Sequence, residues 1–362
     1  MRPLLALILG LVLCAGGARA EEAGTASAIG PVLKRMVTDH VRPAYAAFGN
    51  AAAGLETSFE ALCAEPSDDA LQAARAAFRD AALAWSRIEW IRLGAVMSEN
   101  RLERILFFPD RKGTGRKQVQ AALATQDEGV TDAAALAGRS VAMQGLGALE
   151  LILFGTDSQA LAEAGASHRC RFGRAASANI AALSGELSAG WDEGSTYLAM
   201  FLKPGPDNPL FRTDLEALSV VLGQMIHGLE AIHDTRLGAF LDREDPGRDR
   251  PNSALYWRSD MTLPSVSAGV SGLEDLFTRS GIEVAAQELA PRLADTIRFE
   301  FTQAIRTADS LDAPVDVLLA DPQSREKLVY LAYAIKIIIG RLDQEFGQAG
   351  GLAVGFSFGD GD

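Results

Sequence analysis

One acidic residue, Glu150, stands in an otherwise apolar segment, between Leu149 and Leu151. A carboxylate in an apolar helix must be paired, bind a metal or face a cleft, because an unpaired buried charge is strongly unfavourable. Glu150 is therefore a candidate site residue. The alternative is a helix rotated so that Glu150 reaches solvent. No strand precedes Gly145 and Gly147, so these glycines indicate close helix packing and not a dinucleotide fingerprint.

A second cluster consists of His227, Glu230 and Asp234. On a helix these residues lie within about 60° of arc and share one face. Imidazole and carboxylate groups are common metal ligands, so the spacing offers a weaker candidate metal site. A partly exposed helix face with ordinary charges would show the same pattern.

Two further segments contain basic residues that could bind an anion. Arg258 follows Tyr256 and Trp257, and an arginine beside aromatic rings can hold a carboxylate, or can tie down the carbonyls at a helix end. The basic segment 111–117 could hold a phosphate at a helix N-terminus, but it lacks the spacing of a P-loop, which favours a solvated loop. The sequence has no H-E-x-x-H or C-x-x-C motif, so it makes no self-sufficient case for an enzyme.

The N-terminus reads as a secretory signal. Arg2 precedes an apolar run of about ten residues, and Ala18-Arg19-Ala20 is typical of a cleavage site, so residues 1–20 are predicted to be removed after Ala20. Leu13 stands before Cys14 where a lipoprotein signal needs a small residue, which disfavours a lipid anchor. We therefore expect a periplasmic protein. No later segment reaches the length of uninterrupted apolar sequence that a membrane span needs, so no transmembrane helix is expected in the mature chain.

Charge and cysteine content restrict the partners and the compartment further. Without Arg2 and Arg19, 32 basic residues face 47 acidic ones, a net charge of −15, so nucleic acid is not expected as a partner. The mature chain keeps Cys63 and Cys170. In an oxidising compartment they are expected to form a disulfide, the alternative being two buried thiols.

The hydrophobic pattern is helical throughout, with no alternating strands. Ser67 caps an expected helix with an apolar stripe, and further helices are expected over 133–154, 158–189, 282–308 and 322–346 and from Thr213. The breaker-rich segment 203–209 predicts a domain boundary or a long surface loop. The sequence thus predicts an all-α protein of two helical bundles packed side by side, over residues 28–203 and 204–362.

The mature chain resembles the imelysin-like proteins of the Gram-negative periplasm and outer membrane, from residue 41 to the C-terminus. The segments that carry this resemblance are Trp85 with Glu89, Phe107-Phe108-Pro109-Asp110 with Gly115-Arg116, the segment 254–259, and the ending 354–362.

The resemblance implies two bundle-like domains with a site at their interface, and a link to bacterial iron uptake. It places Glu89, Glu150 and Arg258 together as a ligand site, and the surroundings of Cys63 and Cys170 also resemble the family, in support of a disulfide. The family's hallmark is a metal-binding G-x-H-x-x-E motif. Here Gly147 occupies the histidine position and Glu150 is retained, so the chain resembles a divergent branch.

The sequence therefore predicts a periplasmic protein with a binding or accessory role in iron uptake, with iron-uptake or outer-membrane components as partners. No cofactor is assigned, although the resemblance admits iron or another divalent metal. Two alternatives stay open: a metal-dependent peptidase, which needs a substitute imidazole near Glu150, and a non-catalytic partner of an outer-membrane receptor.

Overall fold

The computed structural model describes residues 29–289 and 292–352. Within these ranges the chain forms helices and no strand, which confirms the all-α prediction. The predicted signal sequence, its cleavage site and Cys14 lie outside the described residues, as does the family-like ending at 354–362.

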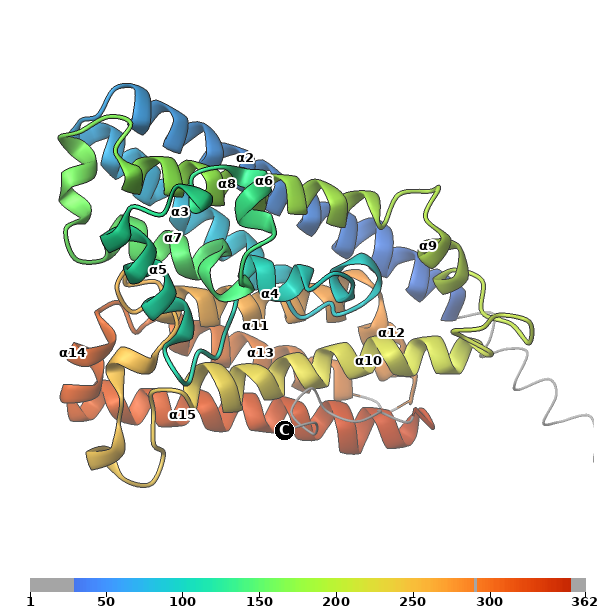
Figure 1. Ribbon diagram of the computed structural model, residues 1–362. Coiled ribbons are helices and arrows are strands. Elements are labelled where there is room, and N and C mark those ends of the chain that lie inside the picture. The colour runs from blue at the N-terminus through green and yellow to red at the C-terminus, as the bar shows by residue number, and fades with distance from the viewer. Residues whose placement is uncertain (1–28, 290–291, 353–362) are drawn as a thin grey trace, which may run out of the picture.

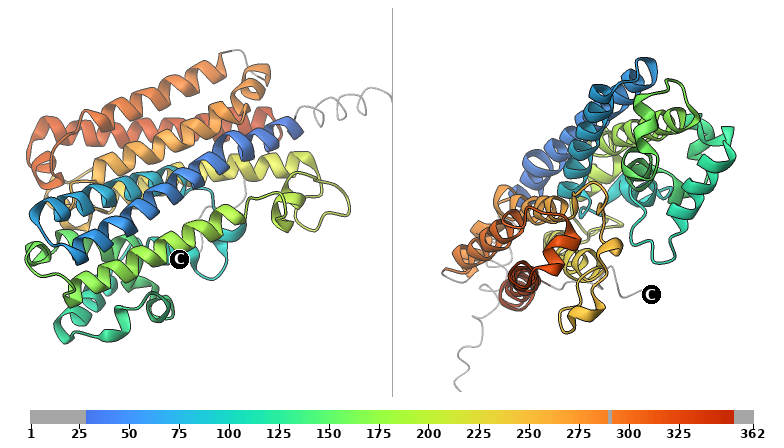
Figure 2. Two further views of the ribbon diagram at one scale, coloured as in Figure 1. Left: turned by 90° about the horizontal axis from the view of Figure 1, so that it is seen from above. Right: turned by 90° about the vertical axis from the view of Figure 1, so that its left-hand side faces the viewer.

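The first helical group contains three long helices, α2 (Arg42–Ala64), α3 (Asp68–Ile88) and α8 (His168–Ala189). They lie side by side in the upper half of Figure 1 and again when the molecule is seen from above in Figure 2. Ser67 caps α3, accepting a hydrogen bond from the amide of Ala70 at 3.1 Å. The predicted stripe of α3 is fully buried, so this amphipathic helix packs its apolar face into the core.

Cys63 and Cys170 form a disulfide that ties the end of α2 to the first turn of α8. Their Cα atoms are 5.7 Å apart, and 107 positions separate them in the sequence. The predicted bridge is confirmed. It closes the chain from the end of α2 to the start of α8, which includes α3, into one covalent loop.

The second helical group contains α10 (Asp214–Glu230), α11 (Thr262–Arg279), α13 (Leu293–Asp309) and α15 (Pro322–Gly340), in the lower half of Figure 1. Thr213 caps α10 and Asp321 caps α15, each accepting a hydrogen bond from the amide three residues later. Two of these helices continue as π-helical turns, over Ala231–Leu237 after α10 and Arg341–Gly347 after α15.

Shorter helices surround these two groups. They are α4 (Arg101–Ile105), α5 (Thr114–Thr125), α6 (Ala133–Ala137), α7 (Gly145–Phe154), α9 (Thr196–Phe201), α12 (Ile282–Leu289) and α14 (Val315–Ala320). Another π-helical turn, Met36–Val41, precedes α2. Single 3₁₀ turns lie at Gly94–Met97, Glu128–Val130, Val141–Met143, Ser158–Ala162, Pro246–Arg248 and Pro251–Ser253.

Three of the expected helices are interrupted. The segment 133–154 divides into α6, a 3₁₀ turn and α7, because Gly138 ends α6 and Gly145 takes a φ of +70°. The segment 158–189 divides because Ser167 caps α8 anew. The segment 282–308 divides into α12 and α13, with Arg292 at a φ of +73° before α13. Apolar periodicity continues through these breaks, so periodicity alone did not reveal them.

The two helical groups share a core. α3 packs against α11, and buried apolar residues from both groups form one connected cluster. The domain boundary at 203/204 stays a prediction. Among the described residues, Asp214–Leu237 is long and apolar enough to cross a membrane, but 67% of its most apolar window is buried inside the protein. Core helices pass the same test, so the absence of a membrane span also stays a prediction.

Candidate functional site

The carboxylate of Glu150 joins the two helical groups. Its Oε1 accepts hydrogen bonds from the Arg258 amide (3.1 Å), the Ser259 amide (3.2 Å) and the Ser259 hydroxyl (3.0 Å). Glu150 is 5% exposed, so the solvent-facing alternative is wrong. Burial raises the pKa of Glu150 above the usual glutamate value, although the bonds from Ser259 and Arg258 and the nearby guanidinium oppose this rise.

The helix that carries Glu150 starts at a position where glycine is required. Gly145 has a φ of +70°, and a Cβ there would lie 2.3 Å from the carbonyl oxygen of Ile105. The main chain at the start of α7 therefore packs directly against α4, as the sequence indicated for this glycine. Gly147, two residues later, is not packed in this way, because a Cβ there would meet nothing within 4 Å.

Gly147 and Glu150 both line a cavity of about 730 Å³. Its other walls come from the segment 106–116, the end of the π-helical turn after α10, and the segment 250–258. The cavity therefore lies between α7 with the segment before α5 on one side and the segments that follow α10 on the other. Gly147 opens the wall where the family motif would place an imidazole.

Glu89 and Arg236 form a second connection between the groups. Nη2 of Arg236 donates to Oε2 of Glu89 at 2.6 Å, and both side chains are more than nine-tenths buried. The guanidinium also stacks on Phe108 and Trp90, 4.7 and 5.5 Å from the ring centroids. Burial raises the pKa of Glu89, and Arg236 is the leading influence that opposes it. Arg236 was not predicted from the sequence.

Tyr256 lies within electrostatic range of both acids. Its side chain is 1% exposed, and its hydroxyl has no hydrogen-bond partner among the described residues. Burial raises its pKa well above the usual value, and the charges of Glu89 and Glu150 raise it further. Glu150 and Tyr256 line the cavity and Glu89 does not, so Glu89 with Arg236 supports the wall from behind.

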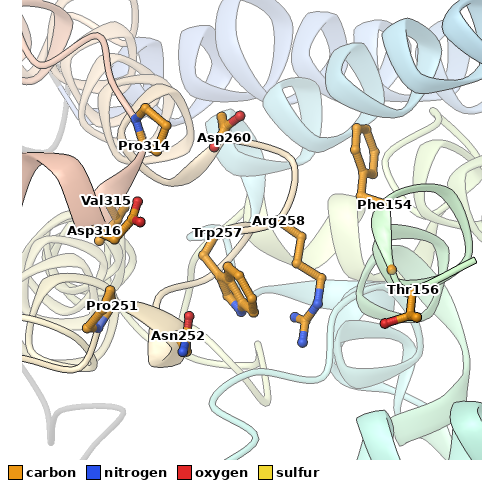
Figure 3. Close-up of a pocket in the computed structure, with 11 residues that line it drawn as sticks. Phe154, Thr156, Pro251, Asn252, Trp257, Arg258, Asp260, Pro314, Val315 and Asp316 are labelled. Carbon is orange, nitrogen blue, oxygen red and sulfur yellow. The ribbon is translucent and has the colours of Figure 1, made fainter. Parts of the chain in front are cut away.

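Arg258 lies where two cavities adjoin. With Trp257 it also lines a second cavity, of about 380 Å³, and Figure 3 shows the two side chains next to each other there. The Arg258 guanidinium lies 4.2 Å from the centroid of the Trp257 ring. Burial lowers the pKa of Arg258, the charge of Glu150 raises it, and the charge of Arg116 lowers it.

The weaker metal candidate is not assembled. His227 Nδ1 pairs with Glu230 at 3.1 Å, but Asp234 pairs with the neighbouring His233 at 2.6 Å. The helix changes to π-helical geometry after Glu230. Asp234 lies in this turn, so it no longer has the position on the helix face that α-helical spacing predicts. Within residues 29–289 and 292–352, no group of three histidine, cysteine or acidic residues is placed to hold a metal ion.

A metal at the family motif does not fit these residues either. Gly147 supplies no ligand, and Oε1 of Glu150 already accepts three hydrogen bonds. None of the four histidines, His40, His168, His227 and His233, lines the cavity beside Glu150. His168 instead bonds the carbonyl of Asp127, and the partners of His227 and His233 are the acids named above. The structure therefore offers no substitute imidazole to this carboxylate.

Comparison with solved structures finds the same fold in distant sequences. An imelysin-like protein from Psychrobacter arcticum 273-4 matches with a TM-score of 0.71 at 18% identity, over 91% of this chain and 98% of its own. A chain named "putative iron-regulated protein A precursor", from Parabacteroides distasonis ATCC 8503, matches with a TM-score of 0.71 at 14% identity, over 89% and 95%.

A search of the curated proteins finds no match. The family model described as imelysin, peptidase M75, matches residues 41–339, which is most of the chain. The all-α fold, the buried glutamate of α7 and the loop before α5 lie within this match. The chain belongs to the imelysin family.

Proposed function

We propose that this protein is exported to the periplasm and there binds a small ligand, as an accessory protein of iron uptake. The observation that carries the proposal is the cavity of about 730 Å³ between α7 and the segments that follow α10, with Gly147 and Glu150 in its wall. Binding sites for small molecules are concave, largely pre-formed and often located between packed units. The name of the Parabacteroides protein, which refers to iron regulation, supports the iron link.

Binding is favoured over metal-dependent hydrolysis by the state of Glu150. A metallopeptidase needs enough ligands to hold an ion and activate water. Here the retained acid holds the main chain of Arg258 and Ser259 in place, and Gly147 leaves space where a ligand side chain would be. A cavity that has charged and polar side chains in its wall also favours ligand binding over a purely structural partner of a receptor.

Filling the cavity tests the proposal. Gly147→Leu would place a side chain in the open space of the cavity wall, while Gly185→Leu would place one on the exposed face of α8, where a Cβ also meets nothing within 4 Å. Each variant would be expressed in the source bacterium after deletion of the gene. Growth under iron limitation and cellular iron content would then be measured.

We expect the wild type and Gly185→Leu to restore growth and iron content, and Gly147→Leu to fail at equal periplasmic abundance. If both variants restored growth and iron content equally, the cavity would not be needed for the function. A deletion strain with normal growth and iron content would overturn the iron-uptake role itself.

Metal titration separates this proposal from the hydrolase alternative. Purified mature protein and Glu150→Gln would be titrated with ferrous, ferric and zinc ions. We expect the same weak, non-stoichiometric binding for both proteins. Tight binding of one ion per chain that Glu150→Gln abolishes would instead establish a rebuilt metal site, and peptidase assays would follow.

A further inference from the structure

We infer that the ligand of this cavity is a small organic polycarboxylate, bound by arginine side chains that include Arg258. The inference rests on the proposed function and specifies its ligand class. Four arginines line the cavity, namely Arg111, Arg116, Arg250 and Arg258. They come from two distant segments of the sequence, and the fold brings them to one cavity.

Within the part of the chain that the structure describes, these arginines have no carboxylate bound directly to them, although the nearby charge of Glu150 favours the charged form of Arg258. Among the described residues, none of the four guanidinium groups forms an ion pair or hydrogen bond with a carboxylate; Arg258 stacks on Trp257. The charge of Glu150 raises the pKa of Arg258, and repulsion from the charge of Arg116 lowers it. An anion between the two arginines would relieve this repulsion. Guanidinium groups bind carboxylates in bidentate geometry, which makes such a cluster specific as well as attractive.

The acids in the same wall are already engaged. The two carboxylate oxygens of Asp110 accept the amides of Thr114 (2.6 Å) and Gly115 (2.8 Å). Oε1 of Glu150 accepts three bonds, and Asp234 pairs with its neighbour His233. The three acids of the wall leave a formal excess of one positive charge over the four arginines, although the whole chain carries a net charge of −13. This local excess of positive charge on an acidic protein favours anions.

Arg258 is the best positioned of the four. Its backbone amide is held by Glu150, and its guanidinium is stacked on Trp257 at 4.2 Å. The other three are exposed at the rim. A donor fixed in advance loses little conformational entropy on binding, so Arg258 is expected to contribute most to affinity. The walls also include Phe107, Phe108 and Trp257, which can cover the carbon skeleton of an organic anion.

The test uses citrate, a tricarboxylate, as the probe for the purified mature protein. Isothermal titration calorimetry would measure its affinity for the wild type, Arg258→Gln, Arg258→Lys and the control Arg212→Gln. Arg212 is an exposed arginine outside both cavities. We expect one citrate per chain with a dissociation constant below about 1 mM. Arg258→Gln should weaken binding about tenfold or more, and Arg258→Lys should recover only part of this loss.

Circular dichroism and thermal melting would confirm that the variants fold; the amide of residue 258 that bonds Glu150 is unchanged in each of them. Inorganic pyrophosphate is the second probe. Citrate binding that the control retains and Arg258→Gln loses supports the inference. It is overturned if citrate does not bind the wild type, if Arg258→Gln binds equally well, or if pyrophosphate binds more tightly than citrate. Any of these results with Gly147→Leu still failing to restore iron uptake would reject the ligand class alone and leave the proposed function standing.

Discussion

Nη2 of Arg236 lies 2.6 Å from Oε2 of Glu89, which is 147 positions earlier in the sequence, and both side chains are almost completely buried. The pair joins the C-terminal end of α3 to the π-helical turn after α10, directly behind the cavity wall. A buried ion pair contributes little net stability compared with an apolar replacement, but removing one partner leaves an uncompensated charge.

The first prediction concerns this pair. Arg236→Met is expected to lower the free energy of unfolding by about 3–5 kcal/mol, because Glu89 would stay buried without its ion-pair partner. Adding Glu89→Gln should recover part of this loss. The exposed pair Arg341–Glu345 provides the control, and Glu345→Gln should cost less than about 1 kcal/mol. Urea unfolding of the four proteins measures all three values. A loss for Arg236→Met no greater than that of the control would contradict the prediction.

The second prediction concerns the disulfide. Replacing Cys63 and Cys170 together by serine is expected to lower the free energy of unfolding by about 2–5 kcal/mol, because the bridge closes a loop of about 100 residues in the unfolded chain. Reductant should destabilise the wild type by a similar amount and leave the double variant unchanged. Thermal melting with and without dithiothreitol would show this. The prediction would be contradicted if the wild type kept its melting temperature after its disulfide had been completely reduced.

The third prediction concerns pH. Burial lowers the pKa of His40 from 6.5 to about 4; Asp275 opposes this effect, and Arg279 and Arg87 add to it. Between these two pH values the unfolded chain binds a proton that the folded chain does not, so stability falls as the pH falls through this window. The loss attributable to His40 is up to about 3 kcal/mol.

The variant His40→Gln isolates this contribution from that of the carboxylates. The unfolding free energy of the wild type minus that of the variant should fall from pH 7 to pH 4, because only the unfolded wild type gains a proton on its imidazole in this range. Urea unfolding at several pH values in this range would follow it. A difference that stays constant with pH would show that His40 does not titrate abnormally.

The fourth prediction separates two glycines of the cavity wall. Gly147→Ala should raise the free energy of unfolding by about 0.5–1 kcal/mol, because the new Cβ meets no atom and alanine favours a helix. Gly115→Ala should lower it by more than about 1 kcal/mol, since its Cβ would lie 2.3 Å from the carbonyl oxygen of Ala142. Denaturant unfolding of both variants decides this. Equal effects at the two sites would contradict the geometry of the wall.

The sequence alone predicted much of the fold. Capping at Ser67 and Thr213, and apolar stripes at helical spacing, located most of the long helices, because these signals act within one turn of the chain. It also marked Glu150 as exceptional, since a lone acid among leucines needs a partner wherever it is buried. The pairing of Cys63 with Cys170 was expected from their number and compartment.

The tertiary structure decided which residues meet. Ser259 is the partner of Glu150 across 109 positions, and Arg236 is the partner of Glu89 across 147. It also showed that Asp234 pairs with His233 and that Gly147 lines a cavity. Helical periodicity reports which face of a segment is buried, but not which other segment covers it. Long-range pairs and cavities depend on how whole helices pack, and that information is spread over the entire chain.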